Sequence, residues 1–309
     1  VGSELCIRDR HWTGPSYPTG SAHARRSPTR RSFVTAPASS PRQEFAREAT
    51  RPDADIDLAR VALLIAREEY PQLPPEPYLA RLDQLAEEVR DRLSDETAPP
   101  VVLQELLGVI YEKHGFKGNR EAYYDPRNSF LNDVLDRRKG IPLTLGIVVL
   151  EVGWRLGLPL EGVNFPHHFL VRYAGDVLQL LIDPFDGGQV RFQDQAQEFL
   201  DRVYGGMVRV RASFLAPASR RDMLVRLLTN LKSLYTNVGD DIRAVAAVER
   251  ILLLRPDANQ EHRELGLLFA RLGRSEEAAR HLRTFLSREP GSPEAPRVRA
   301  ILRDLGVDP

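Results

Sequence analysis

Cysteine is nearly missing from this chain of 309 residues, which contains only Cys6. One thiol per chain excludes a disulfide framework, and it excludes a zinc site built from several cysteines of the same chain. This composition suits a reducing compartment, so we expect a cytoplasmic protein that carries no metal ion and no cofactor. The chain also starts without an apolar segment, and we therefore expect no secretory signal.

An excess of charge of either sign is missing too. Lysine plus arginine and aspartate plus glutamate each total 43, so the formal net charge is zero. Such a balance excludes a general attraction to nucleic acid or to acidic membranes. The longest apolar run, from Leu143 to Val152, is shorter than the roughly 20 residues that a membrane-spanning helix needs. We therefore predict no general nucleic-acid binding and no membrane association.

Residues 1–42 have little that would support a core. They are rich in serine, proline, threonine, glycine and arginine, and they show no period of 2 or 3.6 residues. This composition predicts a disordered basic tail. One interpretation is an arm that binds nucleic acid or phospholipid. The alternative, which we prefer, is a solvated leader or a start codon placed too far upstream.

Apolar residues recur at helical spacing after this tail. Three helices are predicted first, and Pro71 is expected to end the first of them. A short helix follows, with Asn128 or Ser129 as its N-cap. The next helix begins at Pro142 and is apolar almost all round, so we expect it to be the central buried helix.

The pattern then changes to short strands. The runs "HHFLVRY" and "VLQLLIDPF" are separated by "AGD", which predicts a β-hairpin. Gln189 to Phe192 predicts a third strand after a turn, and a helix is expected from Asp194 to Val203. Helices that surround a small antiparallel sheet are typical of the α+β class, here helix-rich.

The C-terminal part contains an internal repeat. Six pairs of similar residues lie 34 positions apart, which is the tetratricopeptide period. The pairs are Leu231 with Leu265, Tyr235 with Phe269, Gly239 with Gly273, Ala244 with Ala278, Leu252 with Leu286, and Pro256 with Pro290. We predict two repeats that dock on the first domain, followed by a capping helix from Glu294 to Leu305.

A histidine and an aspartate lie at the ends of the two hairpin strands, as His168 and Asp183. In a papain-like or transglutaminase-like site, such a histidine is the base and the aspartate orients it. The nucleophile lies at the N-terminus of a central buried helix. Here "RRKGIPLTLG" holds neither cysteine nor serine, and its one hydroxyl, Thr144, is a poor nucleophile. Either another group reacts or the site has no covalent chemistry.

Two segments carry a family resemblance. They are "YYDPRNSFLNDVLDRRKGIPLTLGIVVLEVGWRLGLPLEGVNFPHHFLVR" and "LIDPFDGG". They resemble the bacterial SirB-type proteins, which have a transglutaminase-like domain followed by tetratricopeptide repeats. The resemblance implies a helix-rich, transglutaminase-like (papain-like) α+β domain over residues 43–215. It also implies a tetratricopeptide-repeat region over residues 220–309.

The resemblance also assigns the site residues one by one. The family has Pro-Gly-His-Phe where this chain has Pro166 to Phe169, so His168 matches the family histidine and His167 replaces a glycine. Asp183 matches the family aspartate. The family generally lacks the transglutaminase cysteine, as this chain does. The resemblance therefore implies the fold and does not imply an activity.

Five further residues are candidates for a binding surface. Asn128 would line the cleft near the start of the buried helix, or else cap the short helix. Arg138 and Lys139 precede that start and would bind an anion or an acidic partner. The alternative for them, which we favour, is a solvated charged turn. His167 is interpreted as a surface substitution, and Arg172 as a rim residue or an ion-pair partner.

A metal site made from His167, His168, Asp183 and Asp186 is disfavoured. Adjacent residues of a strand point to opposite faces, so the two histidines cannot easily serve one ion. The run Asp186-Gly-Gly is more simply a turn. We predict no metal site.

The leading functional hypothesis is a non-catalytic regulatory or scaffolding protein. A degenerate cleft and the repeats would bind a protein or peptide partner, and self-association is an alternative use of the repeats. The second hypothesis is a hydrolase or acyl-transfer enzyme for peptide or amide bonds, with His168 as base, Asp183 as orienter, and water or Thr144 as the attacking group. An open dyad favours the enzyme, and a Thr144 turned into the core disfavours it.

Overall fold

The structure of the chain is a computed structural model, and it describes residues 40–93, 98–176, 178–192 and 195–307. Most of the tail predicted over residues 1–42 therefore lies outside the described residues. The first described helix, α1 (Pro41–Ala49), begins within that predicted tail, so Arg42 is helical. Ser40 caps the helix, because its side chain accepts a hydrogen bond from the Gln43 N–H.

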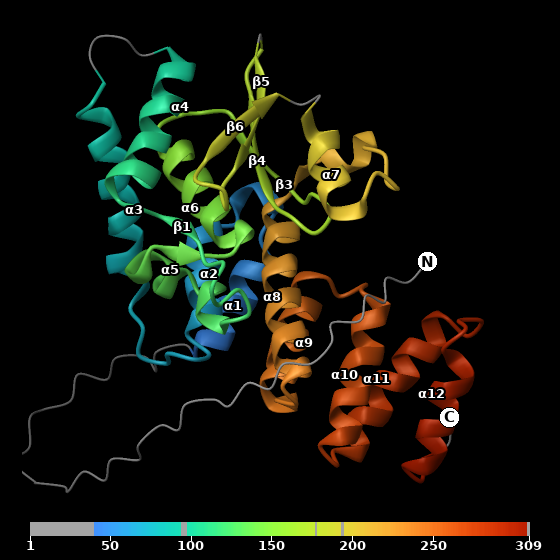
Figure 1. The fold of residues 1–309 in the computed structure, drawn as a ribbon. Coiled ribbons are helices and arrows are strands. Elements are labelled where there is room, and N and C mark those ends of the chain that lie inside the picture. Colours follow the sequence, from blue (N-terminus) through green and yellow to red (C-terminus); the bar gives the residue numbers. More distant parts are fainter. Residues whose placement is uncertain (1–39, 94–97, 177, 193–194, 308–309) are drawn as a thin grey trace, which may run out of the picture. The chain divides into compact units, whose positions relative to one another are not determined.

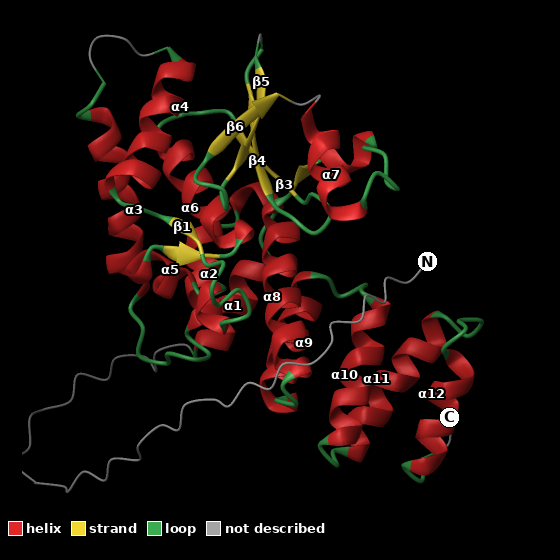
Figure 2. Cartoon of the chain, viewed as in Figure 1, coloured by secondary structure: helices red, strands yellow, loops and turns green. Residues whose placement is uncertain are grey.

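Helices make up most of the described chain, and most of the strands gather in one small sheet (Figure 2). The helices of the first half are α1, α2 (Leu58–Ala66), α3 (Pro75–Arg90), α4 (Pro99–Leu107), α5 (Leu131–Arg137) and α6 (Pro142–Arg155). Helices α2 to α5 pack around α6, and α1 packs against α2. Three short helical segments connect them, namely η1 (Asp53–Asp55), η2 (Gly108–Lys113) and η3 (Pro126–Asn128).

Helix α6 is the central buried helix that the sequence predicts. Every residue from Pro142 to Gly153 is buried, and Pro142 occupies the first turn, where its missing N–H costs nothing. Gly157 follows the helix with a φ of 73°, the left-handed conformation that commonly ends helices. None of the helices in the described ranges is long and apolar enough to cross a membrane.

A five-stranded antiparallel sheet packs beside α6, with the strand order β6-β5-β4-β3-β7 (Figure 1). The strands are β3 (Leu160–Val163), β4 (Leu170–Ala174), β5 (Gln179–Asp183), β6 (Gln189–Phe192) and β7 (Pro217–Ala218). The predicted hairpin is β4–β5 and the predicted third strand is β6. A separate parallel pair joins β1 (Lys117–Gly118) to β2 (Lys139–Gly140).

Both faces of the sheet are covered. Val171 and Ile182 pair across β4 and β5 and point toward α6, within the main hydrophobic core. Their neighbours Leu170 and Leu181 point to the other face, where they pack against α7 (Ala196–Tyr204) and η5 (Ala212–Leu215). This alternation follows from the two-residue period of a strand.

The C-terminal region consists of helix pairs with the predicted repeat. The helices are α8 (Arg220–Asn237), α9 (Asp241–Leu254), α10 (Asn259–Arg271), α11 (Ser275–Arg288) and α12 (Ala295–Asp304). Gly239 and Gly273, 34 residues apart, turn the chain between the helices of each pair with φ values of 73° and 72°. The capping helix predicted from Glu294 corresponds to α12.

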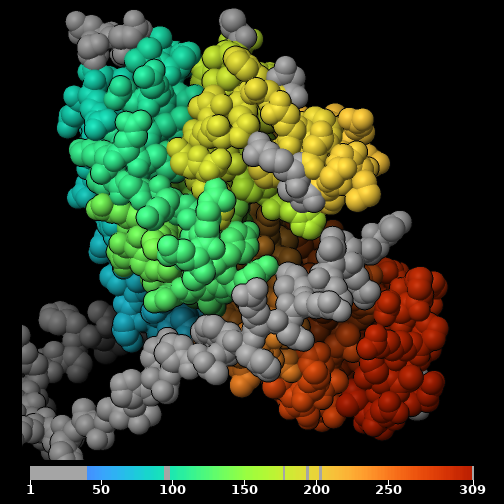
Figure 3. Space-filling model, in the orientation of Figure 1, coloured from blue at the N-terminus to red at the C-terminus, as the bar shows by residue number. Residues whose placement is uncertain are grey.

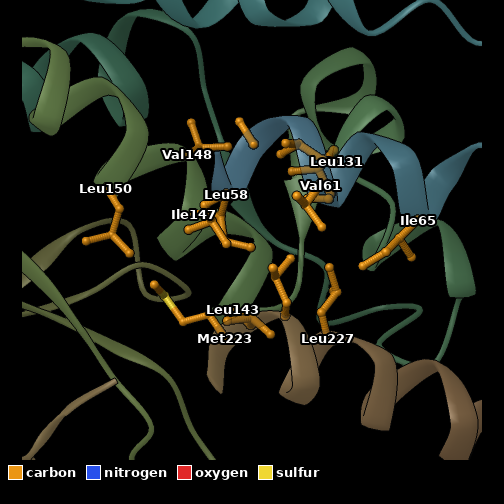
Figure 4. Packing of buried hydrophobic residues seen from close by; sticks show 14 of the residues in the cluster. Leu58, Val61, Ile65, Leu131, Leu143, Ile147, Val148, Leu150, Met223 and Leu227 are labelled. Carbon is orange, nitrogen blue, oxygen red and sulfur yellow. The ribbon is translucent and has the colours of Figure 1, made fainter. Parts of the chain in front are cut away.

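The first helix pair packs into the core of the first domain. Figure 4 shows Met223 and Leu227 of α8 among Leu58 and Val61 of α2 and Ile147 of α6. One hydrophobic cluster includes these residues and extends from α1 into α10 and α11. The predicted docking of the repeats on the first domain therefore takes the form of a shared core.

Polar groups fix the start of α8 to the first domain. The carboxylate of Asp53 accepts the backbone N–H groups of Arg220 at 3.1 Å and Arg221 at 2.8 Å, so it occupies the N-terminus of the helix, where negative charge is favourable. The Arg221 side chain donates to the carbonyl oxygen of Ala49 at 2.7 Å. The Arg220 guanidinium lies over the Trp154 ring, 4.7 Å from its centre.

Two histidines pair between α10 and α11. The Nδ1 atoms of His262 and His281 lie 2.9 Å apart, so one ring donates, the other accepts, and both are neutral. Burial lowers the pKa of both rings, aided by Arg288 beside His262 and by His262 and Arg280 beside His281, with Glu277 opposing. The pKa of His281 falls to about 4.

Acidification is therefore expected to weaken the repeats. Unfolded histidine titrates at about pH 6.5, so the stability of the pair is complete above that pH. It is lost as the pH falls toward about 4, because only the unfolded chain then gains protons. We expect about 1 kcal/mol of loss, since the rings are partly exposed. Urea unfolding at several pH values measures it, and His281→Gln should flatten this dependence while His167→Gln leaves it in place. An unchanged slope in the His281 variant would contradict the assignment.

Candidate functional site

His168 and Asp183 come together where β4 begins and β5 ends, beside α7. His168 Nε2 lies 2.8 Å from Asp183 Oδ1, and the two residues are 8% and 5% exposed. His168 lies in a turn two residues before β4, and Asp183 is the last residue of β5. An ionised carboxylate only accepts hydrogen bonds, so His168 Nε2 donates to Asp183. Among the described residues Nδ1 has no partner.

Asp183 also organises the turn that follows β5. Its Oδ1 accepts the backbone N–H groups of Phe185 at 3.0 Å and Asp186 at 3.2 Å. Burial acts to raise the pKa of Asp183, but the hydrogen bond and charge of His168 and these two N–H groups outweigh it, so the pKa is lowered. The carboxylate is thus held ionised, both as the orienter of His168 and as a structural cap of the turn.

Aromatic rings enclose the imidazole. The Phe199 ring of α7 lies 4.6 Å from the His168 ring, centre to centre, and Phe185 meets it edge-on at 6.3 Å. Tyr111 donates to the carbonyl oxygen of Pro184 at 3.1 Å. Burial and the nearby charge of Asp183 raise the pKa of Tyr111, so this phenol stays protonated.

Thr144 is turned into the core and away from any reacting role. It is fully buried, and its hydroxyl donates to the carbonyl oxygen of Asn128 at 2.7 Å. The Thr144 hydroxyl oxygen also accepts the N–H of Ile141 at 3.2 Å. The start of α6 still lies under the dyad segment, because a methyl group on Gly146 would meet the Phe169 ring at 2.5 Å.

Asn128 is a buried hub and not an N-cap, since Phe130 holds the N-cap position of α5. Its Oδ1 accepts from Asn119 Nδ2 at 2.9 Å, and its Nδ2 donates to the carbonyl oxygens of Ala122 at 2.7 Å and Tyr123 at 3.1 Å. Its exposed fraction is 0%. The prediction that Asn128 or Ser129 caps this helix is therefore wrong, because Phe130 holds that position and the Asn128 amide is engaged by Asn119, Ala122 and Tyr123.

The remaining predicted binding residues lie around this centre. Arg138 is exposed at the left-handed end of α5, and Lys139 pairs loosely with Glu121 at 3.7 Å. His167 is exposed with a φ of 55°, a conformation natural for the glycine it replaces in the resembling family. Arg172 forms an ion pair with Glu161, as one of its two interpretations expects.

Sequence reasoning missed the segment that borders the dyad. Arg120 lies over the Phe185 ring at 4.9 Å and pairs with Asp186 at 2.9 Å, and Tyr123 meets the same ring at 5.8 Å. Tyr123 and Tyr124 stack edge to face and are 39% and 59% exposed. In Figure 3 the green surface of this part of the chain meets the yellow surface of the later strands. The exposed "YY" pair was the available signal.

Metal ligation finds no support in this region. Within the described ranges, no group of three or more histidine, cysteine, aspartate or glutamate side chains is arranged to hold a metal ion. The two adjacent histidines also diverge, since His168 is buried against Asp183 while His167 is exposed and contacts the Tyr204 ring at 5.5 Å.

Comparison with known proteins agrees with this architecture. Residues 76–229 match the family model described as the transglutaminase-like superfamily, and residues 231–303 match the model described as tetratricopeptide repeat. The predicted fold class, a transglutaminase-like domain with a small antiparallel sheet followed by helical repeats, is confirmed. No solved structure matches the chain.

Two bacterial relatives match this chain over most of its length, and a mouse protein matches less than half of it. The UPF0162 protein of Xylella fastidiosa (strain 9a5c) is 38% identical over 260 residues, which are 83% of this chain and 92% of that protein. The UPF0162 protein of Vibrio cholerae is 29% identical over 261 residues, 83% and 96% of the two chains. F-box only protein 21 of Mus musculus is 33% identical over 142 residues, 45% of this chain and 23% of its own. The chain, with its transglutaminase-like domain and tetratricopeptide repeats, therefore belongs to the UPF0162 protein family.

Proposed function

We propose that the chain is a non-catalytic regulatory or scaffolding protein that binds protein or peptide partners. The observation that carries this proposal is the hydroxyl of Thr144. It is fully buried and donates to the Asn128 carbonyl oxygen, so it is committed as a structural group. The start of α6, where related folds carry a nucleophile, then offers no reacting side chain to His168.

The repeats support a binding role. Tetratricopeptide repeats generally present surfaces for peptides or helices. Three large apolar side chains of this region face solvent: Val238 is 62% exposed, Ile242 is 72% exposed and Leu253 is 42% exposed. Solvent-facing apolar groups on a repeat helix are candidate contacts for a partner. Self-association of the chain would use the same groups, and we propose a cytoplasmic setting and a SirB-type regulatory context for either interaction.

A hydrolase or acyl-transfer enzyme for amide bonds is the second candidate. One observation favours it: His168 and Asp183 have the 2.8 Å geometry of a base and its orienter, with the imidazole Nδ1 unengaged among the described residues. Water would be the attacking group in that case. A dyad alone supplies only part of the rate enhancement of a complete triad.

Amide cleavage and peptide binding, measured on the same preparations, separate the two candidates. We expect the full chain to cleave none of a panel of fluorogenic peptide amides, with His168→Ala giving the same background rate. Peptides selected from a random display library should bind wild type and His168→Ala alike and bind Ile242→Asp more weakly. The matched control is Arg303→Asp, a charge change on an exposed residue of α12. Cleavage that disappears in His168→Ala would establish the enzyme instead.

A further inference from the structure

Arg226 of α8 is a half-buried cation placed against the dyad segment. Its Nη1 donates to the Asn164 side-chain oxygen at 3.2 Å and to the Phe165 carbonyl oxygen at 3.3 Å. The same Phe165 oxygen accepts the backbone N–H of His168 at 3.0 Å. The guanidinium and the dyad histidine are therefore fixed to one peptide unit.

In the described ranges, no carboxylate pairs with Arg226, and its Nε and Nη2 have no hydrogen-bond partner there either. Burial lowers its pKa, which reports the cost of removing the cation from water. Arg250 of α9, which is more deeply buried than Arg226, pairs with Glu68. A desolvated guanidinium is normally paired, so the free positions of Arg226 indicate a place for an anionic group.

The residues around Arg226 indicate which chemical groups would accompany the anion in a ligand. Tyr123 lies close enough for the charge of Arg226 to act on its phenol, and its ring packs on Phe185 beside His168. Tyr124 extends the aromatic surface outward. Arg120, another cation of this border, is already paired with Asp186. One free positive charge next to aromatic rings matches a carboxylate beside an apolar residue better than a phosphate, which carries more charge.

We propose that Arg226 binds a carboxylate of a peptide partner, with the rings of Tyr123 and Tyr124 packing on the neighbouring peptide residue. This inference rests on the proposed binding function and names its ligand chemistry. The fork of the guanidinium has two unengaged nitrogens, Nε and Nη2, which can hold both oxygens of one carboxylate. The carboxylate comes from an acidic side chain or from a chain end, and the chemistry is the same for both.

The test uses pools of short acetylated peptides and the full chain. Three pools are matched: one has a fixed glutamate and an amidated end, one has glutamine in its place, and one has a free C-terminal carboxylate and no acidic side chain. We expect at least one acidic pool to bind about tenfold more tightly than the glutamine pool. That preference should disappear in Arg226→Gln and return partly in Arg226→Lys. Arg303→Gln, an exposed arginine on α12, is the control.

The outcomes are separable. Binding without an acidic preference, or no binding at all, overturns the carboxylate assignment, and so does a preference that survives in Arg226→Gln. Preference for the glutamate pool identifies a side-chain carboxylate, and preference for the third pool identifies a chain end. Failure of the broader function would instead appear as His168-dependent amide cleavage. Thermal unfolding of each variant shows whether it is folded. If Arg226→Gln does not fold, Arg226→Lys, which retains the charge, is the variant to compare with wild type.

Discussion

Asn128→Ala is expected to lower the free energy of unfolding by about 3–4 kcal/mol. The side chain is fully buried, and its loss would leave the amide of Asn119 and the carbonyl oxygens of Ala122 and Tyr123 without their partners. Each buried group left unsatisfied costs about 1–3 kcal/mol. Urea unfolding followed by circular dichroism measures the change.

A neighbouring asparagine provides the matched control. Asn132 of α5 is 4% exposed, but its Oδ1 has no partner among the described residues. Asn132→Ala should therefore cost about 1 kcal/mol or less, since it leaves fewer polar groups unpaired. Chymotrypsin should also cut after Tyr123 faster in Asn128→Ala, because that amide holds the segment. Equal stabilities for the two variants would contradict the role given to Asn128.

Glu151→Ala is expected to cost about 3 kcal/mol. Glu151 is 6% exposed, and its Oε1 accepts the N–H of Ala59 at 2.9 Å, in the first turn of α2. Its Oε2 lies 2.6 Å from Arg155 Nη1. Burial raises the pKa of this carboxyl, and the hydrogen bond from Arg155 opposes that rise. Removal of the side chain would leave the Ala59 N–H without its acceptor, and it would leave Arg155 with Asp83 as its remaining carboxylate partner.

The variant Glu151→Gln distinguishes the contribution of the hydrogen bond from that of the negative charge. The glutamine oxygen still accepts the Ala59 N–H, so we expect a loss of only about 1 kcal/mol. Glu76→Ala is the control for a carboxylate that pairs on the surface, because Glu76 is exposed and pairs only with Arg60. A Glu151→Gln chain as unstable as Glu151→Ala would show that the charge, not the hydrogen bond, holds α2 to α6.

The elements that were predictable from sequence are those whose signals are local. The helix after Pro142 is apolar all round, and the strands β4, β5 and β6 have aromatic or β-branched runs and turn residues between them. Strand β3 was missed because it is short and contains Glu161 and Gly162, and its pairing with β4 and β7 is a long-range property. Helix α2 ends at Ala66 and not at Pro71.

In the candidate site, too, the features with local sequence signals were predictable and the others were not. Spacing along the chain was enough to pair His168 with Asp183, because the two lie at the ends of a hairpin whose register is local. The roles of Asn128 and Thr144 depended on the conformation of the loop from Asn119 to Asn128 and on its contact with the start of α6, so their polarity alone could not reveal a structural use. The position of Arg226 near the dyad could not be predicted for a related reason. Nothing in its neighbourhood along the sequence indicates that α8 brings it to the segment before His168.

The contact between Arg220 and Trp154 gives the molecule a native optical probe. The indole N–H donates to the Leu160 carbonyl oxygen at 2.8 Å, while the cation over its ring comes from α8. The chain has one other tryptophan, Trp12, and its replacement by phenylalanine leaves a single emitter at the junction of the two domains. Emission from Trp154 then changes when α8 separates from α6, so fluorescence follows the detachment of the repeats directly.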